Sequence, residues 1–190
     1  MSGILADNTG RASGLLKAAG GGGKVGQYLY TVLTAHDQSS STLDTWIDVT
    51  NLNVAITPSA TNSIIIIDYS LITSNGDRSY WGWSKVSRDI GGAGYGDWNY
   101  NIGASDGSSA RCSGAVRQEQ WGGSGSDKAT SDTGAKLKDD THNTTSEITY
   151  KVQFYNANGG AVKINRSNNT TDSDETARSI SWISATEILA

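Results

Sequence analysis

The sequence has few of the residues that cross-link small proteins or bind metal ions. Its 190 residues include one cysteine, Cys112, one proline, Pro58, and two histidines, His36 and His142. A single cysteine excludes a disulfide within the chain. Neither histidine has a cysteine or second histidine at metal-ligand spacing, so we expect no zinc site. Cys112 is interpreted as a buried small apolar residue, and both histidines as solvated loop residues.

Long apolar runs and blocks of like charge are also missing. The longest apolar run, Ile64–Ile67, is far too short to cross a bilayer. The N-terminus lacks the charged segment and apolar run of a signal peptide. The net charge is −4, and nucleic-acid binding would need a basic stripe that is not there. We therefore expect synthesis in a cytoplasm, no membrane insertion and no nucleic-acid partner.

Several known catalytic and cofactor motifs are absent as well. Gly20–Gly23 precede Lys24, but Val25 stands where a phosphate-binding loop needs Ser or Thr. The acidic turn Asp172–Glu175 lacks the Gly and distal Glu of a calcium loop. There is no nucleophile elbow. We predict no catalytic residue, no metal and no cofactor, hence not an enzyme, although sequence alone does not exclude a paired-carboxylate glycosidase.

Glycine, Ser, Thr and Asn are abundant, and they separate short segments rich in β-branched and aromatic residues. Period-two patterns or β-branched runs predict ten strands: Lys24–Leu33, Thr45–Thr50, Val54–Thr57, Ser63–Thr73, Tyr80–Val86, Trp98–Ile102, Ala110–Arg117, Ile148–Tyr155, Ala161–Asn165 and Ser179–Leu189. The Gly- and Ser-rich segment Trp121–Thr133 is expected to be a long surface loop.

This pattern predicts an all-β fold, a jelly-roll-like antiparallel β-sandwich over residues 24–190. Lys24–Leu33 and Ser63–Thr73 carry apolar residues at both alternating sets of positions, which indicates strands covered on both faces. Apolar residues make up only 36% of the chain, so the core is expected to be thin and completed by partner subunits. Packing into a homotrimer would also hide the sheet edges.

Residues 1–23 differ from the rest and form a separate N-terminal segment. Apolar patches there are followed by the four glycines Gly20–Gly23, which act as a flexible tether. The segment is either a disordered tail or a peptide that orders when it docks on another protein. The docking hypothesis names these residues: Ile4, Leu5, Arg11, Leu15, Leu16 and Lys17.

Aromatic residues are concentrated in the middle of the chain, among Asn, Asp, Gly and Ser. Aromatic faces stack on sugar rings, and the same residue types also suit subunit contacts. Both alternatives, a ligand contact or a core and subunit contact, stay open for the following residues: Tyr80, Trp81, Trp83, Tyr95, Trp98, Tyr100 and Trp121. Trp81 and Trp83 are two apart and should share one face of a strand.

Three stretches carry a resemblance to a known group of proteins: Ile4–Ala19 with the glycines and Lys24-Val25, Trp46–Ser63, and Thr149–Phe154 with Val162–Ser167 and Glu187–Leu189. They resemble small virion structural proteins of marine bacteriophages, especially those that infect cyanobacteria. The segment Asp77–Lys136 has no match to that group.

The resemblance implies a tail fibre, fibre head or other surface appendage, with residues 1–23 docked on the tail or capsid. The aromatic middle would then be the variable outward face, in contact with host surface polysaccharide. The alternative is a capsid decoration protein with the same trimer, and a minor alternative is a hydrolase of surface glycans. The expected partners are other copies of the chain and other virion proteins, and the expected location is the virion.

Overall fold

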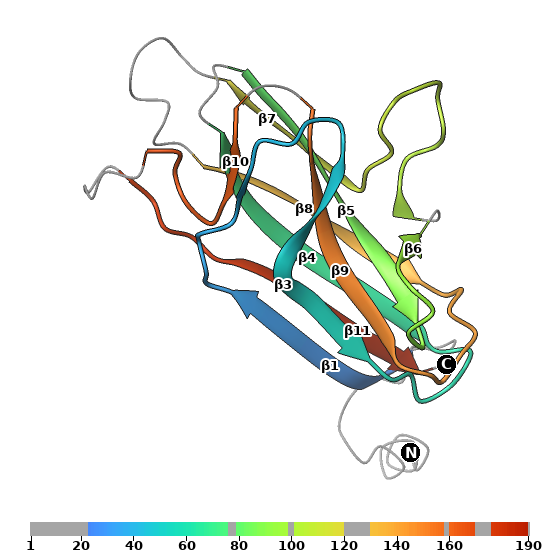
Figure 1. Cartoon of the computed structure of the whole chain (residues 1–190). Helices are drawn as coiled ribbons and strands as arrows, with labels where there is room; N and C mark the ends of the chain where they lie inside the picture. Colours follow the sequence, from blue (N-terminus) through green and yellow to red (C-terminus); the bar gives the residue numbers. More distant parts are fainter. Residues whose placement is uncertain are drawn as a thin grey trace, which may run out of the picture.

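The computed structural model describes residues 23–75, 79–98, 101–119, 130–157, 160–169 and 176–189, with the backbone alone for 79–81, 97 and 117–119. The docking residues Ile4 to Lys17 lie outside this range. Within it the chain forms eleven strands and no α-helix (Figure 1). The strands are β1 (Lys24–Leu33), β2 (Ser39–Ser40), β3 (Trp46–Ile56), β4 (Ile64–Asn75), β5 (Ser79–Ile90), β6 (Gly96–Asp97), β7 (Gly114–Glu119), β8 (Ser131–Asp139), β9 (Ile148–Asn156), β10 (Val162–Ile164) and β11 (Ser181–Leu189).

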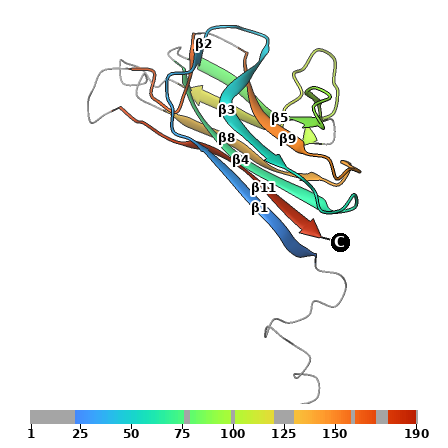
Figure 2. The same ribbon diagram turned by 60° about the horizontal axis from the view of Figure 1, so that its bottom comes forward.

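The strands form two antiparallel sheets, and the predicted β-sandwich is confirmed. Sheet A places β1, β11, β4 and β8 side by side, with short β10 and β2 extending one end (Figure 2). Sheet B contains β3, β9 and β5, with β6 and β7 on the far side of β5. Among the eight strands of six or more residues, the pairing is nested: first with eighth, second with seventh, third with sixth, and fourth with fifth.

The core lies between the two sheets and is built from alternate residues of their long strands. In β9, Ile148, Tyr150, Val152 and Phe154 are buried, while the residues between them face out. In β4, Ile65, Ile67, Tyr69 and Leu71 are buried in the same way. Alternation with a period of two puts one set of side chains on each face of a strand, so each strand contributes one apolar row to the core.

Burial on both faces of β1 and β4 was expected from their sequences, and for the chain by itself this prediction is wrong. Leu29 and Leu33 point inward from β1, but Tyr28, Tyr30 and Val32 are exposed on its other face. The run of four isoleucines in β4 alternates between fully buried and half-buried residues. No described segment covers the outer face of sheet A.

β3 is one strand, where the sequence predicted two short strands separated by Asn51-Leu52-Asn53. The strand continues through this point because a bulge absorbs the interruption: the register against β9 shifts between Asp48 and Asn53. Asn51 adopts a positive φ of 62°, a conformation that Asn tolerates better than most residues. Bulges of this kind bend a strand and redirect its side chains.

Two further predictions differ from the structure. Residues 131–139 form β8, which the sequence did not predict, and β8 begins inside the expected surface loop. Of the segment expected as a strand at 98–102, the described residues Trp98, Asn101 and Ile102 are not in a strand, and Asn101 N–H bonds Trp98 O. The Asn101 carboxamide instead bonds the backbone of Lys138, donating to its carbonyl and accepting from its N–H, each at 3.2 Å. It thereby occupies part of the free edge of β8.

Candidate functional site

The aromatic residues singled out from the sequence do not form one cluster among the described side chains. Trp98 is 2% exposed and lies in the core, 5.5 Å from the Tyr150 ring. Trp83 is half-buried on the outer face of sheet B, and Tyr95 is 43% exposed. Tyr100, Trp121 and the side chains of Tyr80 and Trp81 lie outside the described residues.

A buried polar network beside Trp98 joins the two sheets. The Asp139 carboxylate, fully buried at the end of β8, accepts two hydrogen bonds from Arg88 Nη1, at 2.7 and 2.8 Å. It also accepts one from the Tyr150 hydroxyl at 2.7 Å and one from the Thr141 N–H at 3.0 Å. Burial, and then the charge and hydrogen bond of Asp139, raise the pKa of the Tyr150 hydroxyl. The carboxylate is saturated with donors and closed to solvent, so the network is structural.

An aromatic row crosses the outer face of sheet B and contains Trp83. In register, Trp46 of β3 pairs with Tyr155 of β9, and Tyr155 pairs with Trp83 of β5. The rings of Trp46 and Tyr155 are 5.2 Å apart, and Lys85 Nζ lies 4.4 Å from the Trp46 ring centroid. All three aromatic side chains are half-buried, so each keeps part of its ring accessible.

A polar cluster adjoins this row on the same face. Asp48 accepts hydrogen bonds of 2.6 Å from Lys151 Nζ and from Gln153 Nε2. Burial alone would raise the pKa of the Asp48 carboxyl, but these two hydrogen bonds and the Lys151 charge hold it below its ordinary value. Lys151 Nζ also lies 3.6 Å from the ring centroid of Tyr95. Carboxylate, amide and ammonium groups thus stand beside accessible aromatic rings.

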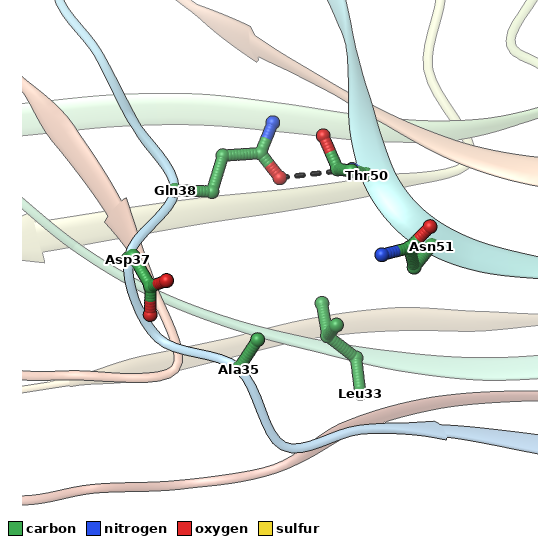
Figure 3. Close-up of a pocket in the computed structure, with 6 residues that line it drawn as sticks. All are labelled: Leu33, Ala35, Asp37, Gln38, Thr50 and Asn51. Carbon is green, nitrogen blue, oxygen red and sulfur yellow. Dashed lines mark hydrogen bonds between the residues drawn. The ribbon is translucent and has the colours of Figure 1, made fainter.

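A small cleft lies between the connection from β1 to β2 and the bulge of β3 (Figure 3). Its volume is about 340 Å³, at the lower end of the range for small-ligand sites. Leu33 and Ala35 form one wall, while Asp37 and Asn51 stand on opposite sides (Figure 3). The cleft presents a carboxylate and a carboxamide above an apolar surface, an arrangement that suits a small polyhydroxy group.

The walls of the cleft are held by side-chain amides. Gln38 donates to Asp48 O at 2.7 Å and accepts from Thr50 N–H at 2.9 Å, so its carboxamide pairs with the β3 edge as a neighbouring strand would. On the other side, Asn165 donates to the carbonyls of Leu33 and Ala35 at 2.7 and 3.0 Å. The sequence signal for this cleft was the interruption at Asn51, which was interpreted only as a strand boundary.

The two histidines differ in environment. His36 is exposed, as expected. The prediction of a solvated His142 is wrong: it is 4% exposed, and its Nε2 lies 2.8 Å from Ser63 O. Its ring sits between two backbone carbonyls, Ser63 and Thr144, and joins the loop after β8 to the start of β4.

No group of three or more His, Cys, Asp or Glu residues is arranged to hold a metal ion in the described ranges. Over the same residues, no helix is long and apolar enough to span a membrane.

Comparison with known proteins assigns no family. No family model and no curated protein matches the chain. Among solved structures, the chain is similar to one from infectious bursal disease virus, Gx strain, with 12% identity and a TM-score of 0.39 over 87% of this chain and 43% of that one. A structure of the Gt strain gives 10% identity and a TM-score of 0.39 over 86% and 38%. This chain therefore spans less than half the length of either.

Proposed function

We propose that this chain is a structural protein of the bacteriophage virion, a surface appendage of the tail-fibre or fibre-head type. The observation that carries the proposal is the nested strand order. Pairing of first with eighth, second with seventh, third with sixth and fourth with fifth, in the sheets β1-β11-β4-β8 and β3-β9-β5-β7, is the order expected for a jelly roll and supports the proposal. Jelly rolls recur in capsid and lectin domains.

In this proposal the chain binds and does not catalyse. The N-terminal segment docks on the tail or capsid through Ile4, Leu5, Leu15 and Leu16, and Gly20–Gly23 leave the sandwich free to orient. The sandwich acts as a homotrimer. Asp139, one of the buried acids among the described residues, is saturated by neighbouring donors, so it has no spare lone pair for chemistry on a substrate.

The outer face of sheet B is the surface that contacts host polysaccharide in this proposal. The row Trp46, Tyr155 and Trp83 offers rings for stacking, and Asp48 and Gln153 offer acceptors and donors for sugar hydroxyls. The expected result is that Trp83→Ala weakens binding of purified host surface polysaccharide in a titration roughly fivefold or more, given a loss of more than about 1 kcal/mol for a contributing interface residue. The control Lys136→Ala changes an exposed side chain on β8 of the other sheet and should leave binding unchanged.

The position of the protein on the particle tests the proposal as a whole. A density map of purified particles should place a few to tens of copies on the tail, and deletion of residues 1–19 should abolish incorporation. Hundreds of copies on the shell would make it a decoration protein. Release of reducing sugars from host polysaccharide would make it a hydrolase. Absence from the particle would refute every virion role.

A further inference from the structure

The outer face of sheet A has two halves of different character. The cross-strand rows are Val32–Trp182–Ser70–Gly134, Tyr30–Ser184–Asp68–Lys136 and Tyr28–Thr186–Ile66–Lys138. A fourth row is Val25–Ile188–Ile64. On β1 and β11 these rows contain no charged residue, whereas on β8 they contain two lysines and, farther along, Asp132. Only the β8 half has the charged residues that are usual on a solvated surface.

The uncharged half carries a contiguous apolar patch, which we call the β1 face: Val25, Tyr28, Tyr30, Val32, Ile64, Ile66, Trp182 and Ile188. Tyr28 is 60% exposed, Tyr30 47% and Val32 42%. The rings of Tyr28 and Tyr30 are 6.3 Å apart, and those of Tyr30 and Trp182 are 5.7 Å apart, so three aromatic side chains form a ladder. Contiguous apolar surface of a few hundred Å² on a soluble protein marks an interaction site.

The free edge of β1 differs from the other edges of the sandwich. The bulged edge of β3 is occupied by the Gln38 carboxamide, and the edge of β8 by the Asn101 carboxamide. Among the described residues, no side chain bonds the backbone of Lys24–Val32, and β1 pairs only with β11. β1 is also ten residues long, with no proline and a lysine only at its first position. The register of β1 against β11 shifts between Val25 and Tyr28, but the edge from Tyr28 to Val32 is continuous and is a template for another chain.

Sequence periodicity indicates which faces are covered in the working assembly. β9 alternates strictly, and its outer residues Thr149, Lys151, Gln153 and Tyr155 are mostly polar. β1 does not alternate, because its outer positions are occupied by tyrosine and valine, and the outer positions of β4 include Ile64, Ile66 and Ile72 beside Asp68 and Ser70. A solvated outer face selects polar residues at those positions, and a covered one does not. The β1 face therefore has the composition of a buried surface.

We infer that the β1 face is the contact between copies of this chain, in the trimer of the function proposed above. Three strands about 4.8 Å apart and about 33 Å long have a footprint on the order of 500 Å² before side-chain relief is added. A standard interface buries about 800 Å² per partner, so the face supplies more than half of that area and its rim would have to supply the rest. Contacts between identical subunits are more apolar than other interfaces, with charge confined to the rim.

The rim also favours a second copy as the occupant. Beside the β1 face, Lys136 pairs with Asp68 and Lys138 with Asp140 within the chain, so both signs of charge border the same apolar centre. In a cyclic trimer each copy meets its two neighbours through different parts of its surface, so the lysines of one copy can lie against acidic groups of the next. A partner with a strong charge of one sign would meet like charges as well as opposite charges at this rim.

The oligomeric state of the full chain and two variants tests the inference. Tyr28→Arg and Tyr30→Arg each place a charge in the centre of the face, at side chains that are about half exposed and outside the core. Sedimentation equilibrium should show a wild-type oligomer, and a dissociation constant raised roughly thirtyfold or more in each variant, as for loss of a hot-spot aromatic residue. The matched control Ala55→Arg, exposed on β3 of the other sheet, should sediment as wild type does.

The outcomes separate this inference from the function on which it rests. An oligomer unchanged by both variants overturns the β1 face as the contact, although a virion role would stand. A monomeric wild type also overturns it. If the β1 amides of that monomer exchange faster when residues 1–19 are deleted, the chain's own N-terminal segment covers the β1 face. Circular dichroism and thermal unfolding of dilute samples check that the arginine variants remain folded. Absence of the protein from particles refutes the function alone.

Discussion

The Arg88–Asp139 ion pair should contribute more to the free energy of unfolding than most side-chain contacts of the fold. Asp139→Asn removes the carboxylate charge with little change in side-chain size. In the variant, Arg88 keeps its positive charge in a site where its side chain is 19% exposed, without the carboxylate that now lies 2.7 Å away. Breaking a buried ion pair on one side costs about 3–5 kcal/mol, mainly because the remaining charge is left uncompensated. For a folded region of this size, that loss corresponds to a fall in Tm of about 6–20 °C.

Asp68→Asn provides a matched control on the same sheet. Asp68 pairs with Lys136 at 3.1 Å, but the side chains are 33% and 71% exposed, so solvent screens the pair. Exposed ion pairs contribute about 0–1 kcal/mol. Urea unfolding at a fixed protein concentration measures both variants, since dissociation of an oligomer would otherwise shift the midpoint. Equal losses in the two variants, or less than about 1 kcal/mol for Asp139→Asn, would show that burial does not set the strength of this pair.

Three further predictions concern other parts of the sandwich. Gly134→Ala should destabilise the chain by at least ~2 kcal/mol in urea unfolding, because a Cβ there would lie 2.2 Å from Tyr69 O on the neighbouring strand, whereas Gly103→Ala meets nothing within 4 Å and should be neutral. Gln38→Ala should accelerate hydrogen exchange of the Thr50 amide and cost about 1 kcal/mol; unchanged exchange would contradict the strand-like role of Gln38. Glu187 has a lowered pKa: burial would raise it, but hydrogen bonds from the Ser59 backbone, Ser63, Ser59 and Gln27 outweigh that effect. Its stabilisation is therefore present above the pKa of the unfolded chain and is lost as the pH falls through the lower folded value. Unfolding measured from neutral pH down to strongly acidic pH should show a smaller acid loss for Glu187→Gln than for wild type.

The fold class could be predicted because most core strands carry their burial pattern in their own residues. The alternation in β9 and the isoleucine run in β4 are local signals, and both strands are where the sequence places them. β8 was missed because its only large apolar residue is Leu137, and its other inward positions are Thr133, Ala135 and Asp139. Those residues become inward-facing only through pairing with β4, which is a contact across more than sixty positions of the chain.

The grouping of aromatic residues on the outer face of sheet B could not be predicted from the sequence. Sequence proximity grouped the aromatic residues between Tyr80 and Trp121, whereas the row on sheet B combines Trp83 with Trp46 and Tyr155 from two other strands. Trp98, from the predicted group, belongs to the core. Strand register decides such groupings, and register depends on the bulge in β3 and on the whole sheet order, which no window of the sequence contains.

The two ends of the described sandwich meet at one corner, so a docked N-terminal segment would transmit force to the fold there. Lys24 pairs with Leu189, so a load applied through residue 23 enters at the β1–β11 ladder. At that corner Gln27 donates to Glu187 at 2.8 Å and to Thr57 O at 2.8 Å, while Glu187 accepts from the Ser59 N–H at 2.6 Å. These bonds join β1 and β11 of sheet A to the loop that leaves β3 of sheet B. A pull on the N-terminal segment is thereby shared between both sheets, and does not act on the edge strand β1 alone.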